Sequence, residues 1–234
     1  MKSVSSNTEL KKMVGVGAAD LILDGMRVGI GTGSTVAFFI MELGRRIKEG
    51  LNIQGVATSY QSRLICSQYG IPLIDSMLIN HLDIAVDGAD EIDPSLNAIK
   101  GGGAAHTIEK VIASMSDEFI LIADETKLVS HLCEQFPLPV EVIPGALTLA
   151  IKKIRDLGGE PLIRMAIRKD GPIITESGNF ILDIAFKSVP KDINVLNAYL
   201  KNIPGLLETG LFLSMAKKAL VSSNGTVKML LPKG

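Results

Sequence analysis

The chain has 234 residues, of which 47% are hydrophobic and 21% charged, and 24 Lys and Arg against 25 Asp and Glu give a net charge of −1. This balance argues against an extended nucleic-acid surface. Two cysteines cannot form a disulfide framework, which favours a reducing, cytoplasmic location. The apolar runs are too short to span a membrane and the N-terminus lacks the apolar core of a signal peptide, so we expect neither insertion nor export.

The first half of the chain alternates short apolar runs with helical patterns. We expect helices that start near residue 7 or 8, that end near residues 49 and 69, and that span 104–115. Strands are expected between them, at 27–30, 52–58, 82–86 and 119–123. Since short apolar strands alternate with helices, these elements predict an α/β fold whose parallel sheet is covered on both faces.

The composition changes near residue 133, where a Pro- and Gly-rich connection begins. The elements that follow are a strand, a helix, a strand, a hairpin and a helix, at 140–143, 147–157, 161–168, 173–175 with 179–186, and 192–201. Together with a last strand after Pro204-Gly205, this order resembles the split βαβ unit of a small α+β domain. The tail is expected to form strands around Asn224-Gly225 and to rejoin the first domain. We therefore predict one domain from 1–132 plus 208–234, and a second from 133–207.

Three polar loops each follow an expected strand, at 31–35, 87–91 and 124–127. In a parallel sheet the loops that follow strands emerge at the same edge, and ligands bind there. The topology therefore predicts that these distant segments meet at one site.

The first of these loops, Gly31-Thr32-Gly33-Ser34-Thr35, suits an oxyanion. The glycines let the backbone approach closely, the hydroxyls donate, and the next helix starts with free N–H groups. The segment is neither a Walker loop, since no Lys follows the second Gly, nor Gly-x-Gly-x-x-Gly, since Val36 replaces the third Gly. The alternative interpretation is a tight turn with a Ser or Thr cap.

The second loop holds four carboxylates within residues 87–93. A metal site is one interpretation, although the segment contains no His or Cys and lacks the spacing of a calcium loop. A solvated acidic turn is another. The third is a set of acids and acceptors for a polyhydroxylated substrate, whose pKa values are pushed apart by their proximity.

Residues 100–110 carry three consecutive glycines into a helix, which is unfavourable for stability unless backbone N–H groups must face a ligand. We expect Ile108, Val111, Ile112 and Met115 to form the apolar face of this helix, with Glu109 beside it. Partial desolvation would raise the pKa of Glu109 toward that of a working base. The alternative is an exposed Glu paired with a lysine.

Eight segments, in order along nearly the whole chain, resemble the type A ribose-5-phosphate isomerase family. The most specific are Asp-Gly-Ala-Asp-Glu at 87–91 and Lys-Gly-Gly-Gly-Ala-Ala at 100–105, and the others are at 29–35, 57–59, 122–127, 138–142, 178–183 and 208–212. The resemblance implies a Rossmann-like parallel-sheet domain with an inserted ferredoxin-like α+β domain, no metal and no organic cofactor. It also implies a homodimer or homotetramer that acts on a small sugar phosphate in the non-oxidative pentose phosphate pathway.

Carried over residue by residue, the resemblance assigns Glu109 as the catalytic base and places Asp87, Asp90 and Lys100 around the reacting end of the sugar. The expected substrate-binding residues come from the same segments and from one N-terminal lysine: Lys11, Thr32, Gly33, Ser34, Thr35, Gly88, Ala89, Gly101, Gly102, Gly103 and Lys127. Two departures from the usual family pattern, His106 and Ile108, lie on the same helix as Glu109.

The expected chemistry is interconversion of ribose 5-phosphate and ribulose 5-phosphate through an enediolate, with charge stabilised by Lys100 and the glycine amides. A non-catalytic sugar-phosphate sensor is the alternative, although such a regulator should carry a DNA-binding helix-turn-helix, which the sequence does not show. A coenzyme A transferase-like enzyme is a second alternative, and it should have a larger nucleotide groove.

Overall fold

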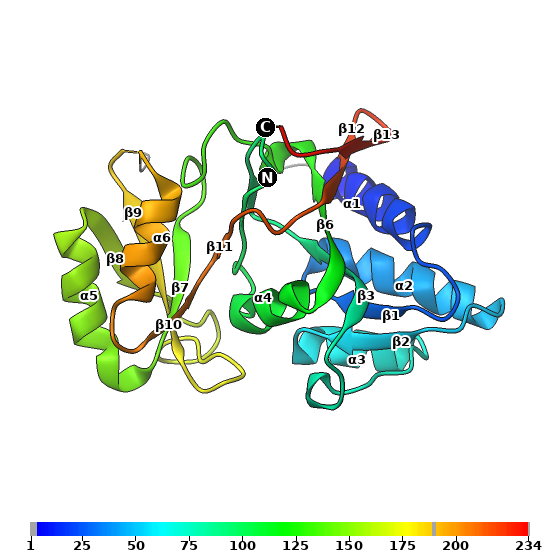
Figure 1. Cartoon of the computed structure of the whole chain (residues 1–234), viewed down its shortest axis with the longest axis horizontal. Coiled ribbons are helices and arrows are strands. Elements are labelled where there is room, and N and C mark those ends of the chain that lie inside the picture. The colour runs from blue at the N-terminus through cyan, green and yellow to red at the C-terminus, as the bar shows by residue number, and fades with distance from the viewer. Residues whose placement is uncertain (1–3, 189–190, 234) are drawn as a thin grey trace.

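The computed structural model describes residues 4–188 and 191–233, and its largest element is a six-stranded sheet in the order β13-β12-β6-β3-β1-β2 (Figure 1). Five neighbouring strands are parallel and β13 is antiparallel to β12. The strands span Arg27–Ile30 (β1), Gln54–Ala57 (β2), Leu82–Gly88 (β3), Ser116–Asp124 (β6), Lys218–Ser223 (β12) and Thr226–Leu230 (β13).

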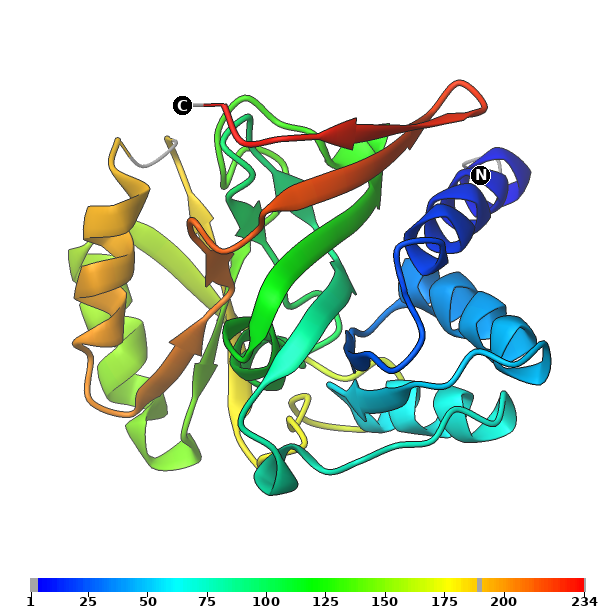
Figure 2. The same ribbon diagram turned by 45° about the vertical axis from the view of Figure 1, so that its right-hand side comes forward.

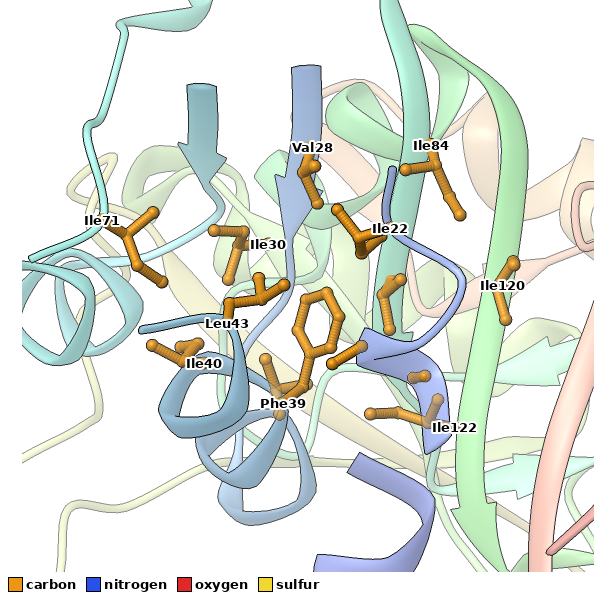
Figure 3. Packing of buried hydrophobic residues seen from close by; sticks show 14 of the residues in the cluster. Ile22, Val28, Ile30, Phe39, Ile40, Leu43, Ile71, Ile84, Ile120 and Ile122 are labelled. Atoms are coloured by element: carbon orange, nitrogen blue, oxygen red, sulfur yellow. The ribbon is translucent and has the colours of Figure 1, made fainter. Parts of the chain in front are cut away.

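Helices cover both faces of this sheet, and the side chains of the strands alternate between two cores. Val28, Ile84 and Ile120 point to the face that packs against α1, α2 and α3 (Figure 3). Leu121 and Ala219 point to the other face, which packs against α4. The helices span Val4–Ala19 (α1), Ser34–Lys48 (α2), Tyr60–Gln68 (α3) and His106–Ser114 (α4). The expected α/β fold with a covered parallel sheet is confirmed.

A second, antiparallel sheet has the order β10-β7-β9-β8 and lies beside the first, with α5 and α6 packed on it (Figure 2). Its elements are β7 (Leu138–Val142), α5 (Leu147–Asp156), β8 (Gly159–Ile163), β9 (Phe180–Phe186), α6 (Ile193–Lys201) and β10 (Leu206–Thr209). It has a hydrophobic core of its own. The division into 1–132 with 208–234 and 133–207 stays a prediction.

The strand expected at 161–168 is wrong at both ends, because β8 begins at Gly159 and ends at Ile163. Beyond Ile163 the chain turns in a tight loop, in which the Ala166 N–H donates to the carbonyl of Gly171 and Gly171 has a φ of 106°. The expected strand at 173–175 is reduced to an isolated bridge between Ile174 and Phe180.

Three very short strands join the two larger sheets. They are β4 (Glu91–Ile92), β5 (Ala98–Ile99) and β11 (Leu211–Phe212), in the order β11-β5-β4. After β11 the chain returns to the first sheet, where β12 pairs with β6. Three short 3-10 helices, η1 (Ser76–Leu78), η2 (Glu125–Lys127) and η3 (Pro144–Ala146), complete the described elements. In the part of the chain that the structure describes, no helix is both long and apolar enough to cross a membrane.

Glu91 holds the connection between the two larger sheets. Its buried carboxylate accepts hydrogen bonds from the backbone N–H groups of Cys133 (2.7 Å), Gln135 and Phe136 (2.7 Å). Because three amides depend on one side chain, truncation would leave them without a partner in a region closed to water.

We expect Glu91→Ala to lower the free energy of unfolding by roughly 3 kcal/mol, since each buried N–H left unpaired costs about 1–3 kcal/mol. Urea denaturation followed by circular dichroism measures this loss. Glu134→Ala is the matched control, because the exposed Glu134 carboxylate also accepts backbone N–H bonds in this connection, from Ser130 and His131. Equal losses in the two variants would contradict the special role of Glu91.

Candidate active site

A cavity of about 310 Å³ opens where β1, β3 and β6 end. The loops that follow these strands meet there, as expected from the parallel topology. They are joined by the glycine segment before α4 and by one residue each from α1 and α3. The lining residues are Lys11, Thr32, Gly33, Ser34, Thr35, Gln61, Gly88, Ala89, Asp90, Lys100, Gly101, Gly102, Gly103, Glu109, Ile122, Ala123, Asp124 and Lys127.

Every residue that the sequence analysis placed in the site lines this cavity except Asp87. Asp87 lies directly behind the lining, 2% exposed, where it contacts Lys100. Gly31 has to be glycine here, because a Cβ atom on it would stand only 2.1 Å from the Asp87 carboxyl. The structure thus brings the predicted residues together at one place, while their roles stay predictions.

Lys100 forms the centre of a buried cluster of charges. Its Nζ atom lies 2.9 Å from Asp87 Oδ2 and 3.0 Å from Glu109 Oε2, and it donates to the carbonyl of Gly88 (2.7 Å). Lys100 is 3% and Glu109 4% exposed. One cation therefore serves two carboxylates, so the cluster carries one negative charge when both acids are ionised.

Burial and the neighbouring Asp87 charge raise the pKa of Glu109 to about 8, although Lys100 opposes this shift. Burial alone would lower the pKa of Lys100, but the two carboxylates outweigh it and raise that pKa. Burial also raises the pKa of Asp87. The N–H groups of Thr32 (3.1 Å) and Gly88 (2.7 Å) donate to Asp87 Oδ1, so the shared negative charge is better held on Asp87 and the exchangeable proton on Glu109.

Two carboxylate oxygens of this cluster depend on Lys100. Within residues 4–188 and 191–233, Asp87 Oδ2 and Glu109 Oε2 are among three buried side-chain polar atoms that are not matched by a regular hydrogen bond. Both lie within ion-pair distance of Lys100 Nζ instead. Of the two acids, Glu109 lines the cavity, and a desolvated carboxylate in that position is suited to accept a proton from a bound molecule.

The opposite side of the cavity is suited to an anion. Helix α2 begins there at Ser34, and no side chain caps its first turn, so its N–H groups face the cavity. Lys11 Nζ donates to Ser34 Oγ (3.1 Å), and Lys127 lines the same region. The Thr32 hydroxyl, by contrast, donates to Ser59 Oγ (2.7 Å), so this side chain orders the loop rather than presenting a free donor.

The structure separates the four acids of residues 87–93. Asp87 and Asp90 belong to the site, and Asp90 Oδ2 accepts the N–H of Gly102 (2.8 Å). Glu91 points away to the connection between the sheets, and Asp93 caps its own turn by accepting the N–H groups of Ser95 and Asn97 (both 2.9 Å). The alternating direction of side chains along an extended segment accounts for part of this separation.

The expected apolar face of α4 is wrong at one residue. Ile112 is buried and Ile108 and Met115 pack against the same core, but Val111 is 47% exposed. The fully buried residues of the helix are His106, Glu109, Ile112 and Ala113. The helix lies between the two sheets (Figure 1), and Lys110 donates from it to the carbonyl of Thr209 in β10 (2.7 Å). Contacts with the two sheets and the position of the cavity therefore determine which face of α4 is buried. Glu109 lies on that face instead of beside it.

Two polar lining residues were missing from the sequence-based set. Asp124 follows β6 in a loop that the sequence analysis did single out, and it accepts the N–H of Thr126 (3.1 Å). Gln61 has no comparable signal, because its position at the start of α3 looks like any helical residue. Its Oε1 accepts the N–H of Gly33 (3.2 Å), so it shapes the anion-binding loop.

Comparisons with known proteins agree with this geometry. Residues 54–226 match the family described as Ribose 5-phosphate isomerase A (phosphoriboisomerase A). The chain is 48% identical over 215 residues to ribose-5-phosphate isomerase A of Thermosynechococcus vestitus, covering 91% of each chain. It is 46% identical over 230 residues to that of Methanosarcina acetivorans, covering 98% of this chain and 97% of the other.

Solved structures give the same result. Ribose 5-phosphate isomerase A from Methanocaldococcus jannaschii superposes with a TM-score of 0.92 at 44% identity, covering 97% of this chain and all of the other. A D-ribose-5-phosphate isomerase in complex with phospho-erythronic acid superposes with a TM-score of 0.92 at 43% identity, covering 95% and 98%. The chain belongs to the ribose 5-phosphate isomerase A family.

Proposed function

We propose that this protein is an aldose–ketose isomerase that interconverts D-ribose 5-phosphate and D-ribulose 5-phosphate in the non-oxidative pentose phosphate pathway. Family membership supports the reaction. The observation that carries it in the structure is the buried Glu109 carboxyl, paired with Lys100, which shares one cavity with the N-terminus of α2 and two lysines suited to an anion. A cavity of about 310 Å³ lies at the small end of ligand pockets, which suits a pentose phosphate better than coenzyme A.

In the proposed mechanism Glu109 removes the proton from C2 of the open-chain aldose. The electrons of the C2–H bond form a C1–C2 double bond, and the carbonyl oxygen at C1 takes the negative charge of an enediolate. Glu109 returns its proton to C1, O2 loses its proton as the C2 carbonyl forms, and O1 gains one. Lys100 and the amides of the Gly101–Gly103 segment stabilise the developing charge.

The remaining residues have proposed roles that follow from their positions. Asp87 exchanges protons with the sugar oxygens during ring opening, and Asp90 orients hydroxyl groups. Binding of the phosphate far from the reacting carbons positions those carbons against Glu109. The groups proposed to bind the phosphate are Lys11, Ser34, Thr35 and Lys127, with Thr32, Gly33, Gly88 and Ala89 shaping the cavity and Gly101 the start of the glycine segment.

Incubation of the purified protein with ribose 5-phosphate, with and without excess chelator, tests this function. We expect ribulose 5-phosphate to form at the same rate in both reactions, since the proposed route needs no metal. Binding of ribose 5-phosphate to the folded protein without ketose formation would favour the sensor alternative. Loss of activity with the chelator would contradict the metal-free route.

Asp87→Asn tests the electrostatic coupling in the cluster. Glu109 acts as a base only when ionised, so kcat/KM falls as the pH falls through its pKa of about 8. Removing the Asp87 charge favours ionised Glu109, and we expect the acidic limb of the kcat/KM profile to move to lower pH by about one unit or more. Asp93→Asn, from the same segment but outside the cavity, should leave the limb in place. A shift of the same size in both variants, or in neither, would contradict the coupling.

We also propose a cytoplasmic homodimer or homotetramer, with domains at 1–132 plus 208–234 and 133–207. Exposed apolar side chains on the edge strand β8 and in the loop after it support association. Leu162 on β8 is 71% exposed, and Ile167 in the loop is 99% exposed. Light scattering after size exclusion gives the mass. We expect Leu162→Glu to lower the mass, and a wild-type protein of monomer mass would contradict the proposal.

Limited proteolysis that releases 133–207 as a stable fragment would support the domain division, and cleavage within that range would oppose it.

A further inference from the structure

Arg164 connects the second sheet to the glycine segment of the active site, although it does not line the cavity. It directly follows β8, and its guanidinium reaches the backbone of the segment before α4. Its Nη1 atom donates to the carbonyl of Gly101 (2.7 Å) and to that of Gly102 (3.2 Å). A side chain from one sheet thus holds two successive peptide groups that belong to the site formed by the other.

Asp183 on β9 fixes the orientation of this guanidinium. Arg164 Nε donates to Asp183 Oδ2 (2.8 Å) and Nη2 donates to Asp183 Oδ1. Such a bidentate pair leaves the planar guanidinium little freedom to rotate. Nη1 is therefore presented to the glycine carbonyls at a defined position.

The direction of the two carbonyls determines where the next N–H groups point. In a trans peptide the C=O and N–H groups lie on opposite sides, so the Gly102 and Gly103 N–H groups point away from Arg164. The contacts agree, because the Gly102 N–H donates to Asp90 Oδ2 (2.8 Å) and Asp90 lines the cavity. Within the described residues the Gly103 N–H makes no hydrogen bond, which leaves it available to a ligand.

Besides Arg164, the glycine segment is held by the hydrogen bond from Gly102 to Asp90 and by a turn in which the Ala104 N–H donates to the carbonyl of Gly101 (3.0 Å). Gly101 has a φ of 114°, which a residue with a side chain rarely adopts, and Ala104 has a φ of 59°. A Cβ atom on Gly102 would lie 2.8 Å from Asp90 Oδ1, so the close approach to Asp90 excludes side chains that could pack. Since glycine backbones sample many conformations, an external contact is needed to keep one of them populated.

We propose that Arg164 is a positioning residue for the isomerase: it holds the Gly101–Gly103 peptides so that the Gly102 N–H keeps its hydrogen bond to Asp90 and the Gly103 N–H faces the charge that develops on the substrate oxygens. Its positive charge at the carbonyl side also polarises both peptides, which strengthens their N–H groups as donors. The effect is largest in the enediolate, where the oxygens carry the most charge. This inference rests on the proposed function.

Arg164→Met, Arg164→Lys and Asp183→Asn test the proposal, with the exposed Arg168→Met in the following loop as the matched control. We expect Arg164→Met to lower kcat by roughly 10–100-fold and to change KM by less than about threefold. This is less than the roughly 10²–10³-fold cost of losing a preorganised donor outright, because the substitution displaces the Gly103 N–H without removing it. A Lys cannot bridge both carbonyls and Asp183, so Arg164→Lys should recover only part of kcat. Asp183→Asn should lower kcat by less than Arg164→Met, and Arg168→Met should leave it unchanged.

Binding of phospho-erythronic acid, whose carboxylate resembles the enediolate, separates positioning from a purely structural role. Isothermal titration should show that Arg164→Met weakens this ligand by about the same factor as kcat/KM. Ribose 5-phosphate, measured in an inactive Glu109→Gln background, should be weakened by less than about threefold. A loss of thermal stability with equal weakening of both ligands, or an unchanged kcat, would overturn the proposal.

The proposed function can fail separately. If the wild-type protein does not convert ribose 5-phosphate, the isomerase assignment is wrong, and the role proposed for Arg164 in that reaction is wrong with it. If the wild-type protein is active and Arg164→Met keeps full kcat, only the role of Arg164 is wrong. Should Arg164→Met fail to fold, Arg164→Lys and Asp183→Asn keep the test open, because both retain polar partners in the same space.

Discussion

Glu109→Gln is expected to lower kcat for ribose 5-phosphate by about 10⁴-fold, the upper end of what a general base usually contributes. An amide has nearly the shape of a carboxyl, but it cannot take the proton from C2. The loss should therefore fall on kcat, while binding of ribose 5-phosphate changes little. Steady-state kinetics and isothermal titration of the folded variant measure the two effects separately.

Glu118→Gln is the control for this variant. Glu118 lies on β6, pairs with Lys218 (2.9 Å) and does not line the cavity, so kcat should stay at the wild-type value. A near-normal turnover number for Glu109→Gln would show that another group is the base, and the mechanism proposed for the site would have to be abandoned.

The same substitution should stabilise the fold, and increasingly so at higher pH. Folding raises the pKa of Glu109 from 4.5 to about 8, so between these values the unfolded chain loses a proton that the folded protein keeps. The resulting loss of stability starts near pH 4.5, grows as the pH rises and is complete above about 8. Glu109→Gln removes it. Because each pKa unit is worth about 1.4 kcal/mol, we expect a gain of a few kcal/mol at pH 9 and of less than about 1 kcal/mol at pH 5, measured as a difference in Tm that grows with pH. A gain independent of pH would contradict this origin.

Lys100→Met is expected to have the second largest effect, because Lys100 contacts both buried carboxylates. Without it the mutual repulsion of Asp87 and Glu109 is uncompensated, and breaking a buried pair usually costs about 3–5 kcal/mol of stability. The enediolate also loses its nearest positive charge. We expect kcat to fall by roughly 10³-fold, the upper range for loss of one preorganised donor.

A second variant keeps this prediction testable if Lys100→Met does not fold. In Lys100→Met with Asp87→Asn, one positive and one negative charge are removed together. Thermal denaturation should show recovery of much of the stability, whereas kinetics should show no recovery of kcat. Recovered activity in the double variant would mean that Lys100 acts only by neutralising Asp87.

Prediction from sequence worked best where the signal is local. The strands at 27–30, 82–86 and 119–123 are short, mainly apolar runs, and each has its counterpart in β1, β3 or β6. It was less successful where a contact with another element ends or rotates a segment. The apolar pattern at 161–168 continues past Ile163, but the chain turns there so that Arg164 reaches the glycine segment.

The candidate site divides in the same way. The order of the polar loops along the chain was enough to place Thr32 and Asp90 at one edge of a parallel sheet, because loops that follow parallel strands must emerge together. The resemblance to a known family added Lys100 and Glu109. Gln61 could not be identified, since its contact with Gly33 depends on how α3 packs beside α2.

Local order in the chain was thus sufficient for the alternation of strands and helices and for the edge where the polar loops meet, since periodicity is a property of neighbouring residues. The motifs of the family, matched residue by residue, supplied most of the lining residues. Packing alone decided that Glu109 is buried, that one lysine is shared by two acids and that Arg164 from the other sheet holds the glycine peptides. These features depend on desolvation and on distances between residues far apart in the chain, neither of which a linear pattern contains.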